Sequence, residues 1–165
     1  MRLICFILSC FCVFLSYSQE NINYFDKYNN QHLETYIFDI TFITADDTIN
    51  KQNLYSLQAD SIYLFFYDPF CEHCIGEIKK LKKNKRINKA IKENSLVVLS
   101  IAPDIDYFTW QKTQKEMPKQ WLNVYSSQNA EIIKRLLWRV PELFVLDKEK
   151  KIIYINMYRE DLEDE

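Results

Sequence analysis

The 165-residue chain is 48% hydrophobic and 15% aromatic, with a formal net charge of −2. This composition supports one folded domain with a real core and excludes a disordered chain. The near-neutral charge predicts no general affinity for nucleic acid or anionic membranes, and a single glycine excludes the glycine-rich loops that bind phosphates or dinucleotides.

The first 18 residues differ from the rest of the chain. Arg2 precedes an apolar run from Leu3 to Leu15, and Ser16-Tyr17-Ser18 supplies small residues at the −3 and −1 positions of a cleavage site. This pattern predicts a secretory signal peptide over residues 1–18. We therefore expect an exported protein without stable membrane insertion after signal cleavage.

Two alternatives for this segment stay open. The first is an uncleaved membrane anchor, although the apolar run is shorter than the roughly 20 residues that a span needs. The second is a lipoprotein with Cys10 or Cys12 as the lipidated residue, which would leave a very short apolar stretch before that cysteine.

Residues 19–34 form a polar, Asn-rich lead-in, after which strand and helix patterns alternate. Apolar and β-branched patterns predict strands at Thr35–Ile43, Ser61–Asp68, Ser95–Pro103 and Leu122–Tyr125, then a hairpin formed by "ELFVLD" and "KIIYINMY". Helical periodicity predicts helices at Glu72–Asn94 with a polar break at Asn84, at Asp104–Glu116 with Asp104 as N-cap, and at Asn129–Trp138. This order predicts an α/β domain over residues 35–158, followed by an acidic tail over 159–165.

Two conspicuous groups of side chains have ordinary structural explanations. Trp110, Trp121 and Trp138 each adjoin apolar helix or strand residues, so we expect core packing rather than a substrate groove. The basic run from Lys79 to Arg86 is typical of the solvated face of a helix, with a docking patch as the alternative.

Loss of the signal peptide also removes Cys5, Cys10 and Cys12, so the mature chain keeps Cys71 and Cys74. They lie in "FFYDPFCEHCIGE", where a buried strand ends and a helix begins. A zinc site needs about four ligands, and outside this motif the mature chain offers only His32 and carboxylates. A permanent disulfide closing so short a loop removes little chain entropy. A reversible redox couple is therefore favoured, and we expect no metal or cofactor.

The position of each residue in the motif suggests its chemistry. Unpaired N–H groups and the helix dipole at a first turn favour a thiolate at Cys71, and Cys74, one turn deeper, can attack a mixed disulfide formed there. His73 can stabilise that thiolate whereas Glu72 disfavours it, so their net effect stays open. Glu77 is either a proton relay for Cys74 or a solvated helix residue.

Together with Val140-Pro141 ahead of "ELFVLD", these residues resemble the thioredoxin superfamily over about Thr35 to Tyr158. Within it, Cys71, Glu72, Cys74 and Glu77 match the C-E-x-C-x-x-E pattern of the extracytoplasmic TlpA/ResA-like thiol–disulfide oxidoreductases of Gram-negative-type bacteria. The resemblance implies a thioredoxin-like fold, a central mixed β-sheet flanked by helices. The chain departs from the family where it stops at "MYREDLEDE", so we expect the usual closing C-terminal helix to be shortened or absent. It also implies a periplasmic location.

The resemblance further implies a role for each residue. Cys71 is the attacking thiol, Cys74 the resolving thiol and Glu77 the acid near the buried sulfur. Pro141 is the cis-proline that shapes the substrate groove, where Val140 offers backbone hydrogen bonds and Phe70 and Glu72 contact the substrate. Phe70 stands where tryptophan is common. His73 stands where proline is common, which in family terms indicates a more oxidising couple, as in DsbA-like sites.

We therefore expect a protein-disulfide oxidoreductase that exchanges disulfides with protein substrates through a Cys71–Cys74 couple, with the reductase direction favoured. Its partners are protein thiols and disulfides, and a second thiol–disulfide protein that exchanges electrons with it. The alternative is a thioredoxin-like binding module that presents a groove beside Pro141 without redox turnover.

Overall fold

The computed structural model describes residues 33–137 and 139–157. The chain divides after Leu33, and the fold belongs to the unit that begins at Glu34. The expected signal peptide, most of the expected lead-in, Trp138, and the expected C-terminal helix and acidic tail lie outside the described residues. Within those residues, no helix combines the length and the apolar character needed to cross a bilayer.

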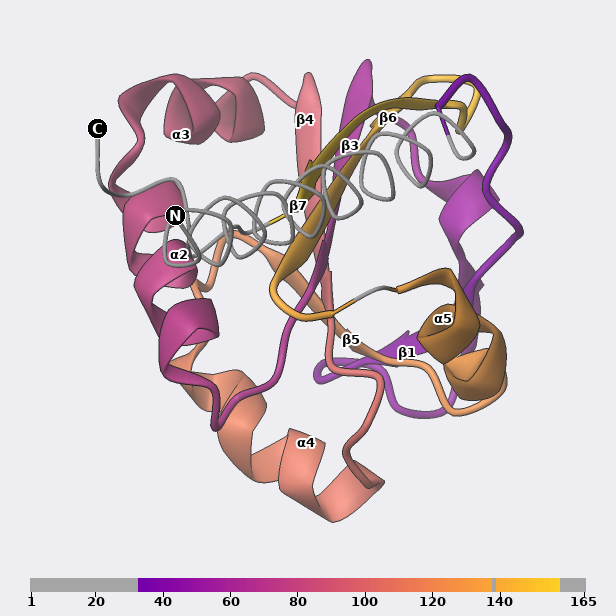
Figure 1. Cartoon of the computed structure of the whole chain (residues 1–165), viewed down its shortest axis with the longest axis vertical. Helices are drawn as coiled ribbons and strands as arrows, with labels where there is room; N and C mark the ends of the chain where they lie inside the picture. Colours follow the sequence, from indigo (N-terminus) through magenta and orange to yellow (C-terminus); the bar gives the residue numbers. More distant parts are fainter. Residues whose placement is uncertain (1–32, 138, 158–165) are drawn as a thin grey trace, which may run out of the picture. The chain divides into compact units, whose positions relative to one another are not determined.

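A mixed seven-stranded sheet forms the centre of the described fold, in the order β2-β1-β5-β4-β3-β6-β7 (Figure 1). Its strands are β1 (Thr41–Thr44), β2 (Gln52–Asn53), β3 (Ser61–Phe66), β4 (Leu96–Ile101), β5 (Leu122–Tyr125), β6 (Glu142–Asp147) and β7 (Ile152–Met157). Strands β3, β4 and β5 run parallel, and the other pairings are antiparallel. The predicted α/β fold with a mixed sheet and a final hairpin is confirmed.

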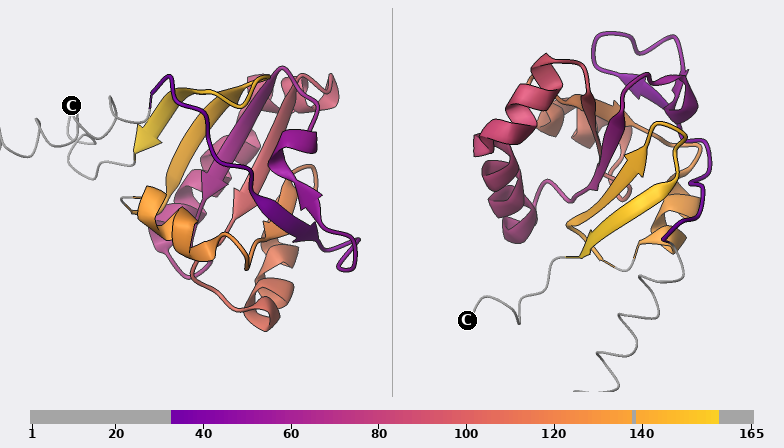
Figure 2. Two further views of the ribbon diagram at one scale, coloured as in Figure 1. Left: turned by 90° about the vertical axis from the view of Figure 1, so that its right-hand side faces the viewer. Right: turned by 90° about the horizontal axis from the view of Figure 1, so that it is seen from above.

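Helices lie on both faces of this sheet (Figures 1 and 2). On one face lie α2 (Glu72–Lys83) and α3 (Lys85–Lys92), on the other α5 (Ala130–Leu136). At the end of the sheet where β3 and β4 finish lies α4 (Tyr107–Thr113), continued by the 3₁₀ helix η2 (Gln114–Glu116). The helices α2 and α3 form the crossover between the neighbouring parallel strands β3 and β4, whereas α5 leads from β5 to the antiparallel strand β6.

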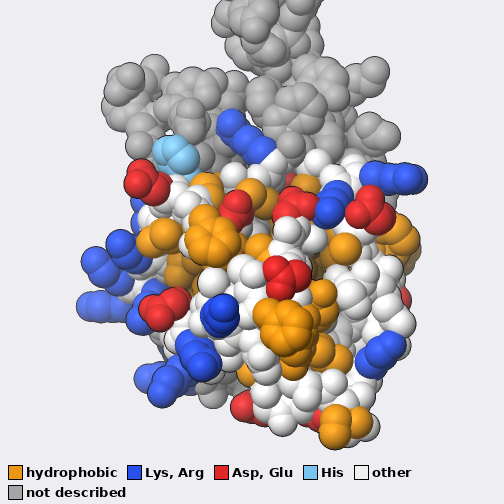
Figure 3. Space-filling view, turned by 90° about the horizontal axis from the view of Figure 1, so that it is seen from below, with side chains coloured by type: hydrophobic (Ala, Val, Ile, Leu, Met, Phe, Trp, Pro, Cys, Tyr) orange, Lys and Arg blue, Asp and Glu red, His pale blue; other side chains and the backbone are white. Residues whose placement is uncertain are grey.

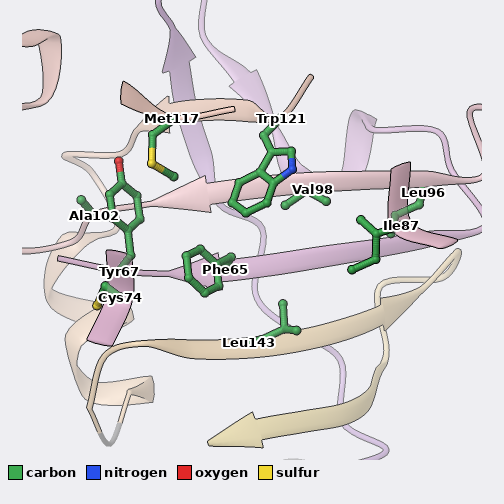
Figure 4. Close-up of a cluster of buried hydrophobic side chains, with 10 residues drawn as sticks. All are labelled: Phe65, Tyr67, Cys74, Ile87, Leu96, Val98, Ala102, Met117, Trp121 and Leu143. Atoms are coloured by element: carbon green, nitrogen blue, oxygen red, sulfur yellow. The ribbon is translucent and has the colours of Figure 1, made fainter. Parts of the chain in front are cut away.

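The central strand β3 is buried on both faces, as its continuous apolar sequence predicted. Ile62, Leu64 and Phe66 are fully buried on one side. On the other side Phe65 belongs to the cluster drawn in Figure 4 and meets Trp121 edge to face, at 5.8 Å between ring centroids. Trp110 and Trp121 are 1% and 4% exposed, which confirms their prediction as core residues.

The predicted strand at Thr35–Ile43 is wrong over most of its length. Residues 34–37 pair with the start of β7, through Ile37 N–H to Lys150 O at 3.1 Å and a bridge between Tyr36 and Lys151. The strand β1 pairs with β5, which lies on the other side of the sheet centre. The segment between them must cross the sheet face, as Figure 2 shows, and a crossing segment cannot remain one strand. Its buried Ile37 and Ile40 produce an alternation that resembles a strand.

Two helix boundaries also differ from the prediction. The helix expected over 72–94 is two helices, because Asn84 ends α2 and its side-chain oxygen accepts the N–H groups of Arg86 and Ile87 at the start of α3. Asp104 is not the N-cap of α4. Asp106 is, accepting the N–H groups of Phe108 and Thr109, because the chain enters helical geometry only at Tyr107.

Candidate active site

The cysteine pair lies where β3 gives way to α2. Asp68 starts the connecting turn: its carboxylate accepts the Phe70 N–H at 2.8 Å and its carbonyl accepts the Cys71 N–H at 3.2 Å. Cys71 is the N-cap of α2, with extended backbone, and its sulfur accepts the N–H of Cys74 at 3.4 Å. A side chain of this turn therefore meets an otherwise unpartnered N–H at the start of the helix.

The two thiols are free but have different surroundings. Cys71 is partly exposed, whereas Cys74 is 0% exposed and its sulfur accepts the Asp68 N–H at 3.4 Å. Burial raises the pKa of the Cys74 thiol from 9.0 to about 12, although the Asp68 N–H acts in the opposite direction. Cys74 therefore keeps its proton at neutral pH while Cys71 remains accessible.

Tyr67 is a site residue that the sequence pattern did not distinguish from an ordinary strand residue. It is 2% exposed, stacks on Phe65 at 6.1 Å between ring centroids and packs in the same cluster as Cys74. Burial, followed by the neighbouring Cys74, raises the pKa of its hydroxyl. Tyr67 thus forms part of the apolar wall that keeps Cys74 protonated.

The two residues between the cysteines, Glu72 and His73, are exposed in the first turn of α2. Glu77 lies one turn beyond Cys74, with its side chain 19% exposed and 3.8 Å from the ammonium group of Lys80. The part of the chain that the structure describes shows no hydrogen bond between Glu77 and Cys74, and the proton relay stays a prediction.

Val140 and Pro141 approach the motif from the far end of the sequence. The peptide bond between them is cis, as the resemblance implied. Pro141 is buried just before β6, whose first residue, Glu142, pairs with Phe66 at the end of β3. Val140 and Cys71 both pack against the cluster of Figure 4, so the predicted groove residue and the predicted nucleophile contact the same part of the core.

Two further site features concern exposure. Phe70, directly before Cys71, is 71% exposed, so its aromatic side chain is open to solvent. Glu142, directly after Pro141, is 1% exposed, which the alternating pattern of a strand did not reveal.

Across residues 33–137 and 139–157, no three His, Cys, Asp or Glu side chains gather as metal ligands.

A CxxC turn at a strand-to-helix junction, adjoining a cis-proline strand, defines a protein of the thioredoxin fold. Residues 38–155 match the AhpC/TSA family, and the chain belongs to that family. The resemblance to the thioredoxin superfamily of thiol–disulfide oxidoreductases is therefore confirmed at the level of the family. None of the curated proteins compared with the chain matches it.

Solved structures of Bacteroides proteins are similar to this chain. A thioredoxin-like protein from Bacteroides caccae is 34% identical, with a TM-score of 0.68 over 76% of this chain and 46% of that one. The chain thus spans less than half of that protein. The C-terminal domain of an uncharacterized protein from Bacteroides fragilis is 30% identical, with a TM-score of 0.68 over 79% and 94%. The thioredoxin domain of a thiol-disulfide oxidoreductase from Bacteroides vulgatus, 19% identical with a TM-score of 0.64 over 79% and 91%, shares the fold.

Proposed function

We propose that this protein is an exported, periplasmic thiol–disulfide oxidoreductase that acts on protein disulfides through Cys71 and Cys74, with reduction as the favoured direction. The observation that carries the proposal is the different exposure of the two thiols within one helical turn. One thiol is accessible and accepts a helix N–H, and the other is buried and protonated three residues later. Export rests on the N-terminal sequence pattern.

In the reducing direction, the Cys71 thiolate attacks one sulfur of a client disulfide. A Cys71–client disulfide forms, and the other client sulfur leaves as a thiolate that takes a proton from water. Cys74 then loses its proton and attacks the Cys71 sulfur, which forms the Cys71–Cys74 disulfide and releases the second client thiolate. Two electrons pass to the client, and a dithiol protein returns the enzyme to its reduced form.

The buried thiol makes the second step depend on a base. A thiol with a pKa of about 12 is nearly all protonated at neutral pH, so a group near Cys74 must accept its proton as the new bond forms. Glu77 is the candidate that the family pattern gives, as a partly buried carboxylate one turn along α2, and Asp68, whose charge also raises the Cys74 pKa, is the second carboxylate near this thiol. Glu77→Gln should slow resolution of the mixed disulfide more than its formation.

Reduction of insulin disulfides by the purified protein, with dithiothreitol as electron donor, tests the proposal. We expect turnover by the wild-type protein, none from Cys71→Ser, and accumulation of mixed disulfides with client proteins by Cys74→Ser. Equal activity from Cys71→Ser would refute the proposal. If the protein binds client proteins but neither reduces insulin nor forms a mixed disulfide with any client, a thioredoxin-like binding module is favoured instead.

The reduction potential of the Cys71–Cys74 couple tests the direction. A value of roughly −270 mV supports a reductase, whereas one of roughly −120 mV indicates an oxidant. The resemblance favours the second value in one respect, because His73 stands where proline is common.

A further inference from the structure

A groove of about 330 Å³ opens beside the cysteine pair, between α2 and the segment formed by α4 and η2. Its lining is mainly apolar and comes from three separate parts of the chain. The apolar lining residues are Tyr67, Pro69, Ile75, Ile78 and Met117.

The lining of the groove includes sequence neighbours of both cysteines, although neither cysteine lines it. Pro69 lies two residues before Cys71, and Ile75 directly follows Cys74. In Figure 4 Tyr67 lies between Cys74 and Met117, so the floor of the groove continues into the wall of the buried thiol. Ile75 is 38% exposed, which leaves an apolar surface available next to the reacting turn.

The rim of the groove is charged. Lys79 and Lys82 form the rim on α2, opposite Glu116 of η2. Neither lysine has an ion-pair partner among the described residues, whereas the neighbouring Lys80 lies 3.8 Å from Glu77. Free ammonium groups beside an apolar surface favour a ligand that carries both apolar and acidic groups.

The helices α2 and α3 carry further positive charge beyond Lys79 and Lys82. Residues 72–92 carry eight Lys and Arg and two Glu, in a chain with a net charge of −2. Figure 3, which views the end where α2 and α4 begin, shows hydrophobic side chains at the centre, Lys and Arg most densely along the left side, and Asp and Glu scattered across the face. The cationic side formed by α2 and α3 is complementary to an acidic partner, and its field acts over about 10 Å at moderate salt.

We propose that this groove binds the client segment that presents its disulfide to Cys71, and that the segment carries an apolar side chain near its cysteine and acidic residues beyond it. The apolar side chain covers Ile75 and Ile78, while the carboxylates approach Lys79 and Lys82. The inference rests on the proposed disulfide exchange, and it names the client chemistry.

Three synthetic peptides test this, each with one cysteine blocked as a disulfide with neutral thiopyridine. The first carries leucine near the cysteine and two glutamates, the second replaces the glutamates by lysines, and the third replaces the leucine by serine. The reduced protein attacks each disulfide, and released thiopyridone reports the rate. Each rate is divided by that of the same protein with neutral dithiodipyridine.

We expect the leucine–glutamate peptide to react about three- to tenfold faster than the leucine–lysine peptide at low salt, and the difference to shrink in high salt. Lys79→Gln/Lys82→Gln should remove this preference. Lys85→Gln/Lys92→Gln, which removes the same charge from exposed positions outside the groove, should retain most of it. Ile75→Gln should remove the preference for leucine over serine.

Equal normalised rates for the three peptides would overturn the groove inference and leave the proposed function intact. Equal loss of preference in both lysine double variants would also overturn it, because the net charge of the helices would then explain the effect. Absence of any exchange that depends on Cys71, with every disulfide including dithiodipyridine, would overturn the proposed function and the inference together.

Discussion

The backbone N–H of Cys74 donates to the sulfur of Cys71 across 3.4 Å, so the buried cysteine orients the accessible one. The Cys74 sulfur in turn accepts the N–H of Asp68, in the turn that leads to Cys71. One short segment therefore holds both sulfurs, each against a backbone donor. The two thiols differ chiefly in burial, and this difference leads to the first two predictions.

The first prediction concerns thiol reactivity. At about pH 8, iodoacetamide should modify Cys71 at least roughly a hundredfold faster than Cys74, because Cys74 is buried and its pKa is about 12. Mass spectrometry of proteolytic peptides after timed quenching measures both rates. In concentrated urea the two rates should converge, and similar rates in the native protein would contradict the structure.

The second prediction concerns stability at alkaline pH. The folded state raises the pKa of Cys74 from 9.0 to about 12, so above about pH 9 the unfolded chain loses a proton that the folded chain keeps. This contribution to stability is present below pH 9 and is lost as pH rises toward 12, with a slope of about 1.4 kcal/mol per pH unit.

Urea unfolding of wild type and Cys74→Ala between about pH 8 and 10 measures this slope. The variant should be less stable at pH 8, because it leaves a cavity in the core, but its stability should fall less steeply with pH. Tyr67→Phe controls for the second buried acid, whose pKa is also raised. Parallel curves for wild type and Cys74→Ala would contradict the prediction.

The third prediction concerns the junction of α2 and α3. Asn84→Ala removes the oxygen that accepts the N–H groups of Arg86 and Ile87, and should lower the free energy of unfolding by about 0.5–2 kcal/mol. Asn84→Ser keeps an N-cap acceptor and should recover most of the loss. Chemical denaturation of both variants gives the comparison, and equal losses would show that the cap is unimportant.

The fourth prediction compares two aspartates before α4. Asp106→Ala should lower the thermal midpoint, since its carboxylate accepts the Phe108 and Thr109 N–H groups and the Thr109 hydroxyl. Asp104→Ala should have a smaller effect, because Asp104 forms an exposed ion pair with Lys134 at 2.9 Å. Differential scanning calorimetry measures the thermal midpoints of both variants. A larger loss for Asp104→Ala than for Asp106→Ala would indicate that Asp104 is the N-cap.

Much of the fold could be predicted because its strands carry strong local patterns. The strand β3 is apolar on both faces, and the hairpin of β6 and β7 has two apolar segments around a charged turn. The segment before β1 could not be predicted, since Ile37 and Ile40 alternate like strand residues while their backbone crosses between two sheet edges. The polar break at Asn84 was visible, but whether it interrupts the helix depends on its side-chain capping bonds.

For the candidate site, local residues were sufficient to place Cys71 at a helix start and Cys74 one turn later, because the strand end and the helix periodicity lie within a few residues of them. Three features depend on the tertiary structure: the burial of Cys74 in one cluster with Tyr67, the packing of Val140 and Cys71 against that cluster, and the groove lined by Ile75 and Met117. These features bring together residues that are far apart in sequence, through the β3–β6 register and through the placement of η2 across the groove from α2. Such long-range packing decides which thiol is exposed and which surface a client meets, and no local pattern encodes it.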